Sequence, residues 1–409
     1  MSNWPLTSLK GKVRIKHGFA FKSEFFSDEE TSFIVLTPGN FYEEGGFKRL
    51  SGKEKFYTGE VQNEYLHESG DLIVAMTEQA AGLLGSCAIV PESGIYLHNQ
   101  RLGLITTDSN KILKGYVYHV FKTETVREQI RLTSSGSKVK HTSPERIYDV
   151  RIPLPNVSEQ RKIVALLDDI DKKIELNNRI HAELEAVAKT LYDYWFVQFD
   201  YPDTNGRPYK TSGGKMVYNP TLKREIPEGW EPVSVGNIVD IKTGKEDANY
   251  ATESGKYHFF TCGESALRCD DFVFEGKAVL LAGNGSFSVK RYEGKFNAYQ
   301  RTYVLIPKQD ELYAPLYFAV NDKIKTLTSG SRGSIVKFIT KGDIEDICLP
   351  IPKNRKLSFV KTLNSCFNEA SKLYEQNLEL VSLRDWLLPM LMNGQVTVSS
   401  ATQPTMKET

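Results

Sequence analysis

The sequence is poor in cysteine and has no long apolar run. The five cysteines are Cys87, Cys262, Cys269, Cys348 and Cys366. No Cys-x-x-Cys pair occurs among them and no histidine stands at zinc-ligand spacing, so we expect reduced core thiols without a disulfide framework or a metal site. No stretch approaches the roughly 18 consecutive apolar residues that span a bilayer, and residues 1–5 lack a signal-peptide pattern. We therefore expect a cytoplasmic protein that has no membrane contact.

An excess of charge of one sign is also missing. The 409 residues include 52 Lys and Arg against 51 Asp and Glu, which gives a formal net charge of +1. Proteins that bind nucleic acid unaided are usually basic, because Lys and Arg must neutralise phosphates. The balance argues against a free-standing, tight nucleic-acid binder. It leaves room for local basic loops on a neutral chain, with partner subunits supplying more positive surface.

Sequence motifs for catalysis are missing as well. An adenine methyltransferase needs a motif of the Asn-Pro-Pro-Tyr type, and Asn219-Pro220-Thr221-Leu222 lacks its aromatic residue. Gly213-Gly214-Lys215-Met216 does not have the spacing of an ATP-binding loop, and Gly283-Asn284-Gly285 alone is a weak cofactor signal. Pro202-Asp203 has no acidic-x-Lys partner for a nuclease metal site. We expect no catalytic residue, no metal and no cofactor in this chain.

One long internal repeat covers most of the chain. The segment from Gly136 to Pro155 matches the segment from Gly333 to Pro352 without a gap, at a constant offset of 197 residues. Both segments contain Gly-Ser followed by a lysine, and both end in hydrophobic-Pro-hydrophobic-Pro. A repeat longer than 150 residues is a duplicated domain, and it is too long for a solenoid unit or a propeller blade.

Further matches lie upstream in both halves. Asn99-Gln100-Arg101 resembles Tyr299-Gln300-Arg301, and the strand-like residues 70–75 correspond to residues 276–281. Each unit is therefore typical of a module rich in short strands and Gly-bearing turns, and each is followed by a long helix. We predict an α+β protein, with two α/β modules in a pseudo-twofold arrangement joined by two long antiparallel coiled-coil-like helices.

The first long helix is predicted to begin after Pro155. Ser158 is a suitable N-cap, and no proline or glycine follows it until Pro202. Apolar residues recur at alternating spacings of three and four, as in a coiled-coil seam. They are Ile163, Leu167, Ile170, Ile174, Leu184, Ala188, Leu191 and Trp195. Asn177 interrupts the seam and either sets the helix register or is partly exposed. His181 also interrupts it, and we expect it to be solvated or hydrogen-bonded and not to bind a metal.

The second long helix is predicted from about Lys356 to Leu391. Its seam contains Val360, Leu363, Phe367, Ala370, Tyr374 and Val381, and Asn377 interrupts it. Pro389 can kink this helix and Gly394 can cap it. Helices of about 35 to 40 residues are on the order of 50 to 60 Å long. They would hold the two modules about one and a half turns of B-DNA apart. A plain dimerisation or scaffolding coiled coil fits the same pattern, so the helices alone leave both interpretations open.

Several motifs together resemble those of one known family. In chain order they are Pro153-Leu154-Pro155, Glu159-Gln160-Arg161-Lys162-Ile163-Val164, Lys172 to Ile180, Leu191-Tyr192-Asp193-Tyr194-Trp195 to Asp200, Ile226-Pro227-Glu228-Gly229-Trp230 and Leu387-Leu388-Pro389-Met390-Leu391-Met392-Asn393-Gly394. They extend over essentially the whole chain and resemble the specificity (S) subunits of type I restriction-modification systems. The second helix has Leu383-Arg384-Asp385-Trp386-Leu387 in place of the aromatic motif of the first, a difference that is ordinary between the two halves.

The resemblance implies a non-catalytic subunit with two target-recognition domains, each of which reads half of an asymmetric, interrupted site in double-stranded DNA. Its helices would bind two methyltransferase (M) subunits, which methylate adenine at N6 with S-adenosylmethionine. Two restriction (R) subunits would join them for translocation and cleavage with ATP and Mg2+. Two other classes stay open: a stand-alone scaffold or adaptor with a coiled-coil seam, and a fused enzyme with an unrecognised catalytic motif.

Residues that contact DNA are predicted on loops that combine small, polar and cationic side chains. The first such loop contains Ser134, Gly136, Lys138, Lys140 and His141, and the second contains Arg332, Ser334 and Lys337. Ordinary flexible basic loops would have the same composition. Arg101 and Arg301 are shared by both halves, which should read different sequences. We therefore expect these two arginines to hold structure or a backbone phosphate.

Base-reading residues are expected where the halves differ. Candidates are His17, Phe19, Lys22, Thr77, Glu78 and Gln79 in the first half, and Thr243, Lys245, Asn249, Ser286, Lys290 and Arg291 in the second. The aromatic run from Tyr192 to Tyr201 is expected to pack the helix end or to contact a partner.

The predicted boundaries follow from the repeat and the helices. Residues 1–155 form the first target-recognition domain, 156–200 the central conserved helix, 201–225 a Gly/Lys/Pro-rich linker, 226–352 the second target-recognition domain, 353–396 the distal conserved helix, and 397–409 a flexible tail.

Overall fold

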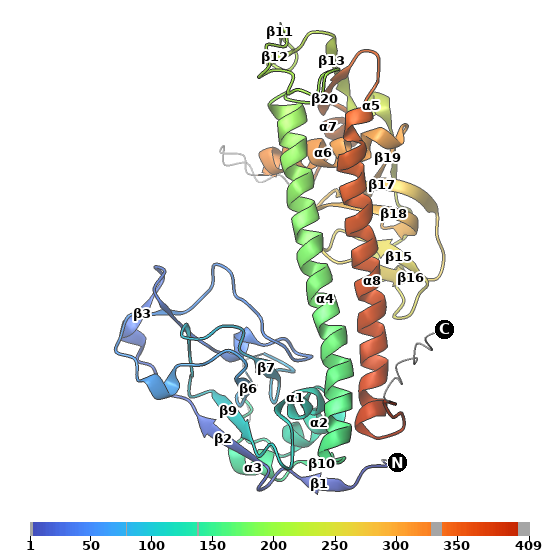
Figure 1. The fold of residues 1–409 in the computed structure, drawn as a ribbon. Helices are drawn as coiled ribbons and strands as arrows, with labels where there is room; N and C mark the ends of the chain where they lie inside the picture. The colour runs from blue at the N-terminus through green and yellow to red at the C-terminus, as the bar shows by residue number, and fades with distance from the viewer. Residues whose placement is uncertain (1–2, 79, 137–138, 329–337, 400–409) are drawn as a thin grey trace, which may run out of the picture. The chain divides into compact units, whose positions relative to one another are not determined.

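A computed structural model describes residues 3–78, 80–136, 139–328 and 338–399 of the chain. It contains two compact units, one made of Met1–Ile174 with Glu379–Thr409 and the other of Glu175–Leu378. Each unit contains one module of the repeat and a part of each long helix (Figure 1). Within the described ranges, no helix is long and apolar enough to cross a membrane.

The first module is built on a four-stranded antiparallel sheet with the order β2-β9-β6-β7. Its strands are β2 (Val13–His17), β9 (Leu102–Thr107), β6 (Leu72–Ala75) and β7 (Cys87–Ile89). The strand β6 is buried on both faces, because Leu72 and Val74 enter one core and Ile73 and Ala75 enter another. This double burial explains why its sequence is uniformly apolar.

Smaller sheets and helices complete the first module. A second sheet has the order β3-β5-β4-β8, and β1 pairs with β10. Their bounds are β3 (Phe26–Ser27), β5 (Phe56–Tyr57), β4 (Phe33–Val35), β8 (Tyr96–Leu97), β1 (Leu6–Ser8) and β10 (Arg151–Pro153). The helices are α1 (Lys114–Phe121), α2 (Glu124–Leu132) and α3 (Pro144–Tyr148). Tyr116 and Val120 of α1 pack in the same core as Leu72 of β6.

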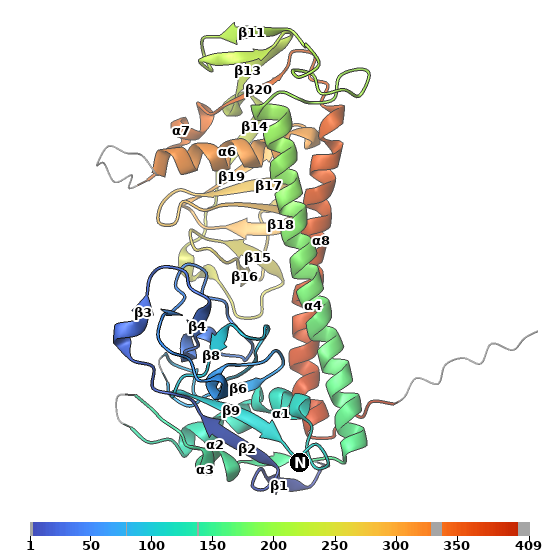
Figure 2. The same ribbon diagram turned by 60° about the vertical axis from the view of Figure 1, so that its left-hand side comes forward.

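The second module repeats this topology in a larger sheet. Its six strands have the order β14-β19-β17-β18-β15-β16, and the first four match β2-β9-β6-β7 (Figure 2). The strands are β14 (Val239–Thr243), β19 (Thr302–Pro307), β17 (Phe274–Ala282), β18 (Val289–Ala298), β15 (Tyr257–Phe260) and β16 (Leu267–Cys269). The parallel pairing of β15 with β18 corresponds to that of β4 with β8. The duplication predicted from the sequence therefore extends to strand order.

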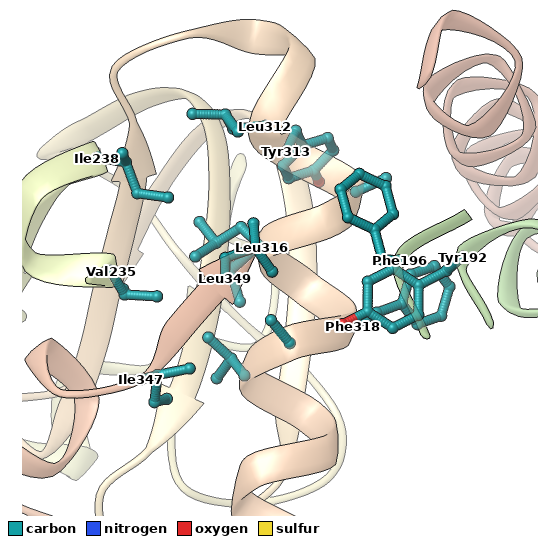
Figure 3. Packing of buried hydrophobic residues seen from close by; sticks show 14 of the residues in the cluster. Tyr192, Phe196, Val235, Ile238, Leu312, Tyr313, Leu316, Phe318, Ile347 and Leu349 are labelled. Carbon is teal, nitrogen blue, oxygen red and sulfur yellow. The ribbon is translucent and has the colours of Figure 1, made fainter. Parts of the chain in front are cut away.

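The core of the second unit joins this module to the end of the first long helix. Its remaining elements are β13 (Trp230–Ser234), β20 (Cys348–Pro352), α5 (Val235–Ile238), α6 (Tyr313–Thr328) and α7 (Lys341–Glu345). Figure 3 shows Tyr192 and Phe196 beside Phe318 of α6. The rings of Tyr192 and Phe318 are stacked with their centroids 5.0 Å apart. A buried aromatic contact of this size fixes the module on the helix.

The first long helix begins after Pro155, as predicted, but its N-cap is a different residue from the expected one. Helix α4 (Val157–Tyr192) is capped by Asn156, whose Oδ1 accepts a hydrogen bond of 3.0 Å from the Glu159 N–H, and not by Ser158. A π-helical turn (Asp193–Val197) follows α4. Helix α8 (Lys361–Met392) starts later than expected: Leu357, inside the predicted helix, has the non-helical angles φ −118° and ψ 36°. A 3-10 turn (Ser358–Val360) precedes it.

The two long helices pack together, as predicted. In the second unit, Asn177 Nδ2 donates to Asn377 Oδ1 at 2.9 Å, and the Trp195 ring lies 5.5 Å from the Phe359 ring. The two contacts show that the helices are antiparallel there. Seam residues that are buried are Ile163, Leu167, Ile170, Ala188, Trp195, Val360, Leu363, Phe367 and Ala370. Partly buried ones are Ile174, Leu184, Leu191 and Val381.

The prediction is wrong at Tyr374, whose side chain is 49% exposed. Phe367, one heptad earlier, is buried by aromatic rings of the second module that include Tyr313, Tyr317 and Phe318. The module therefore accounts for the burial of Phe367, and a position beyond the module is left exposed. Sequence spacing cannot distinguish a seam that faces a helix from one that faces a module.

Residues 201–225, which the composition predicts to be a loop, contain regular structure. Strands β11 (Met216–Asn219) and β12 (Arg224–Pro227) form an antiparallel hairpin. The Arg224 guanidinium lies 4.5 Å from the centre of the Phe199 ring and donates to the Phe196 carbonyl at 2.8 Å. The aromatic run therefore packs at the helix end, as predicted, and holds the hairpin in place.

A buried histidine predicts how stability depends on pH. His98 is 1% exposed, and burial together with the nearby His67 lowers its pKa to about 4. In the unfolded chain its pKa is about 6.5. Between pH 6.5 and 4 the unfolded state binds the extra proton, so stability is lost as the pH falls through this window, by about 3 kcal/mol in total.

Denaturant unfolding of wild-type protein and of His98→Gln at pH 7 and pH 4.5 checks this expectation. Glutamine can still donate to the Lys16 carbonyl that His98 Nε2 contacts at 3.0 Å, but it does not titrate. The variant should lose less stability on acidification than the wild type, whereas a substitution of the exposed His17 should not change the loss. Equal losses of stability in the wild type and in His98→Gln would show that His98 does not cause the loss of stability at low pH.

Candidate nucleic-acid interface

Segments that carry predicted contact residues meet at one edge of the first module. The N–H of Met76 donates to the Arg101 carbonyl at 2.9 Å, and that of Glu78 donates to the Lys140 carbonyl at 2.9 Å. The N–H of Gln100 donates to the Phe19 carbonyl, also at 2.9 Å. We call residues 17–19, 76–78, 99–101 and 140–142 the first loop edge.

The strand order explains why these segments converge. Strand β2 ends at His17, β9 begins at Leu102 and β6 ends at Ala75. Because β9 lies between β2 and β6 and is antiparallel to both, these three strand ends share one edge of the sheet. The loop between α2 and α3 closes against that edge where Thr142 donates to the Met76 carbonyl at 3.0 Å.

The polar side chains of this edge are held by hydrogen bonds. Thr77 Oγ1 lies 3.1 Å from His141 Nδ1, and the His141 ring is exposed. Arg146 donates to Ser135 Oγ at 2.8 Å, which fixes the base of the loop. Ser134 Oγ donates to the Arg131 carbonyl at 2.6 Å, so this serine is held against the last turn of α2. Gly136 has a φ of 103°, a left-handed conformation that favours glycine.

Two cations lie on the first loop edge, and a third follows one of its segments in the sequence. Arg101 is exposed, Lys140 is half-buried, and the Lys22 side chain is 72% exposed. Gln79 and Lys138 lie outside the described residues. The described part of the edge therefore combines hydrogen-bonding groups with exposed positive charge, the pattern of a surface that contacts phosphates and base edges.

The second module builds the same edge from equivalent segments. Gly283 N–H donates to the Arg301 carbonyl at 2.9 Å, Gln300 N–H to the Glu246 carbonyl at 3.0 Å, and Ser286 Oγ to the Cys262 carbonyl at 2.7 Å. We call residues 244–246, 261–263, 283–286 and 299–301 the second loop edge. Lys245 and Arg301 are exposed there. Arg332, Ser334 and Lys337 lie outside the described residues.

Two predicted base-reading residues are instead engaged inside the second unit. Lys290 Nζ donates to the carbonyls of Thr261, at 3.2 Å, and Gly263, and burial lowers its pKa. The Arg291 side chain is 10% exposed and pairs with Glu185 of α4. A side chain committed to such contacts is not available to a base, so we leave both residues out of the interface. The sequence could not show this, because Glu185 is far from Arg291 along the chain.

Sequence comparison of the halves missed one shared pair, Gly18 and Gly244, which directly follow β2 and β14. A Cβ on Gly18 would lie 2.2 Å from the Asn99 carbonyl oxygen, and one on Gly244 would lie 1.9 Å from that of Ala298. Only glycine lets the segment after β2 or β14 pass so close to the backbone that precedes the Gln-Arg turn. Residues 13–16 also resemble residues 239–242, and extending this match by two residues would have found both glycines.

Replacing either glycine by alanine should disturb its loop edge. The added methyl group would meet backbone and not a movable side chain, so we expect Gly18→Ala to cost about 1–3 kcal/mol. Thermal unfolding measures this cost. Gly39→Ala is the control, because its Cβ would lie 3.4 Å from its nearest neighbour, Thr37 Oγ1. Equal stability of the two variants would contradict the close crossing.

The described residues contain no cluster of metal-binding side chains. Across the described residues, no group of three or more His, Cys, Asp or Glu side chains is placed to hold a metal ion. His181, which interrupts the α4 seam, lies 4.0 Å from Glu185 and is partly exposed.

The fold and these edges define a class of protein: a duplicated α+β module on paired long helices, with an equivalent polar loop edge in each module. A family model described as the type I restriction modification DNA specificity domain matches residues 1–186 and 227–379. The chain belongs to this family, as the sequence motifs predicted.

Individual relatives agree with this assignment. The chain is 42% identical over 178 residues to the EcoDI specificity subunit of Escherichia coli, a match that covers 42% of this chain and 40% of the relative. It therefore spans less than half of that subunit. It is 26% identical over 311 residues to the MjaIX specificity subunit of Methanocaldococcus jannaschii, with 70% of each covered. The S subunit structure from M. genitalium has the same fold, with a TM-score of 0.62, 15% identity and 96% of both chains covered.

Proposed function

We propose that this chain is the sequence-reading subunit of a type I restriction-modification complex and has no chemistry of its own. Its two loop edges each read one half of an interrupted site in double-stranded DNA. The observation that carries the proposal is the equivalence of the two edges, which are built by the same strand order and hold different side chains. Two equivalent edges would bind two half-sites, and because their side chains differ, the two half-sites would differ in sequence.

Within each edge, shared and differing residues have different roles. The shared glycines and Gln-Arg turns form the frame, and the exposed polar residues that differ between the halves read bases. The described residues that we assign to DNA contact are Lys22, Arg101, Ser134, Gly136, Lys140, His141, Lys245 and Arg301. The shared Arg101 and Arg301 hold phosphate, which carries no sequence information.

The long helices provide the surface for partner subunits. Large apolar side chains are exposed along them. In the second unit they are Leu176 and Val187 of α4, Tyr194 and Val197 of the π-helical turn that follows it, and Tyr374 of α8; in the first unit they are Leu383 and Trp386 of α8. Apolar surface of this kind is removed from water when a partner protein packs on it. We assign them to two methyltransferase subunits, with two restriction subunits joining the complex. S-adenosylmethionine, ATP and Mg2+ would be bound by those partners.

The test is to purify the chain with the methyltransferase encoded beside it and to map methylated adenines across a genome. A methylated motif in two parts with an unread spacer is the expected result. Methylation without this chain, or with no two-part motif, would overturn the proposal. A scaffold would bind the partner and leave its methylation pattern unchanged, and a fused enzyme would methylate or cut DNA alone.

A further inference from the structure

Arg291 joins the second module to both long helices. Its Nη1 donates to Ser371 Oγ of α8 at 2.9 Å, and its Nη2 pairs with Glu185 Oε1 of α4. The guanidinium carbon also lies 4.0 Å from the centre of the Phe367 ring of α8. One planar cation therefore contacts an anion, a hydroxyl and an aromatic face, which is a combination that lysine cannot reproduce.

The preceding residue, Lys290, holds the second loop edge. Its Nζ donates to the carbonyls of Thr261 and Gly263. The same segment is tied to the Gln-Arg turn, because Cys262 Sγ lies 3.5 Å from the Arg301 carbonyl oxygen. Strand β18 thus supplies Lys290 to the second loop edge and the next residue, Arg291, to the long helices.

The sheet geometry requires these two side chains to point in opposite directions. Lys290 pairs with Leu280 of β17, and Arg291 pairs with Val279. Val279 enters the core shared with α6 and the long helices, whereas Leu280 enters the core on the other face. Consecutive strand residues alternate between the faces. The start of β18 is therefore a direct covalent link between the helix pair and the second loop edge.

The first unit has an ionic contact at the equivalent helix level. Asp171 of α4 is 200 residues before Ser371, the same offset that separates the paired Asn177 and Asn377. It accepts hydrogen bonds from Lys122 of the first module at 3.1 Å and from Arg384 of α8 at 3.0 Å. Burial of Asp171 opposes these cations, but together they hold its pKa below the ordinary value. Both modules are thus attached to the helices by charge, although different elements supply the cation.

We propose that Arg291 is a positioning residue for DNA specificity: it fixes the orientation of the second loop edge on the helices, and so makes recognition depend on the length of the unread spacer. This inference rests on the proposed function. It replaces the sequence hypothesis that Arg291 contacts DNA. The two roles predict different results, because a positioning residue affects discrimination between spacers, whereas a phosphate contact contributes equally to every DNA.

The experiment measures DNA binding by the complex with its methyltransferase. Duplexes carry the mapped site with its native spacer or with one base pair more or less. Arg291→Met should reduce discrimination between these spacers by at least about tenfold, which corresponds to about 1.4 kcal/mol. Glu185→Gln should reproduce this loss, because it removes the charged partner of Arg291. Glu185 is an anion and does not bind phosphate, so the loss could not come from a missing phosphate contact. Lys295→Ala, at a side chain 46% exposed on the same strand, should not change discrimination.

Uniform weakening on all duplexes by Arg291→Met would overturn the proposal, as would normal discrimination by Glu185→Gln. A salt slope lowered by about one unit would identify Arg291 as a phosphate contact.

A second measurement needs no DNA. Amide hydrogen exchange of residues 261–263 should be faster in both variants than in the wild type and in Lys295→Ala. Unchanged exchange in both variants would overturn the positioning role. If the wild-type complex showed no specific DNA binding, the proposed function would fail, and the exchange measurement would still decide whether Arg291 positions these loops.

Discussion

Lengthening both long helices by one heptad is expected to lengthen the unread spacer of the DNA site by about three base pairs. Seven residues add about 10 Å of helix, and B-DNA rises about 3.4 Å per base pair. The first module packs on α4 at Ile163 and Leu167, and the second packs on it at Ala188 and Tyr192. An insertion between these anchor points leaves both module cores intact.

Suitable insertion points lie between Ile180 and His181 in α4 and between Leu373 and Tyr374 in α8. Methylation at the parental sites should fall by about 10³-fold, since one half-site would be lost, and sites with the longer spacer should become methylated. The measurement is adenine methylation mapping in cells. A heptad inserted into α4 alone is the control, and it should destabilise the protein without creating a new motif. A parental spacer in the double insertion would refute the role of the helices as a ruler.

Phe367→Ala is expected to be the most destabilising single substitution considered for this chain. The side chain is fully buried and lies against the rings of Tyr313, Tyr317 and Phe318. Removing a buried phenylalanine costs about 3–5 kcal/mol, because packing is lost and a cavity remains. This is a large share of the stability of an ordinary domain, about 5–15 kcal/mol. Arg291 would also lose the ring beneath it.

Denaturant unfolding of both alanine variants tests this expectation. Tyr374→Ala is the matched control, since it changes an aromatic residue one heptad further along α8 that is half-exposed. It should cost less than about 1 kcal/mol, as surface substitutions usually do. Similar costs for the two variants would mean that α8 buries its face by the heptad rule and not by contact with the module.

The duplicated modules and the paired helices were predictable because each leaves a local pattern. Gly136–Pro155 and its copy at Gly333–Pro352 keep one offset, and α4 and α8 keep the spacing of a seam. The same matching placed Gln100 and Gln300 at equivalent points, and the hydrogen bonds that both make to the loop after β2 or β14 confirm the equivalence. Asn177, for which the sequence left two interpretations, is fully buried against Asn377.

Contacts between distant segments were not predictable in this way. Lys290 and Arg291 have the composition of a DNA-reading pair, and only the pairing of β18 with β17 shows that they point to opposite faces. The hairpin of β11 and β12 contacts the helix end through Arg224 and Phe199, whereas the Gly/Lys/Pro-rich composition of residues 201–225 predicts only a loop.

The sequence by itself determined the number of modules, the helices between them and the family, because repeats, periodicity and motifs are properties of neighbouring residues. The tertiary structure alone decided which polar residues lie exposed at the loop edges and which make contacts inside the protein. The physical reason is that a cation has the same local sequence signal whether it faces solvent or a buried carboxylate. The partner that decides between these roles is Glu185 for Arg291, on an element more than a hundred residues away.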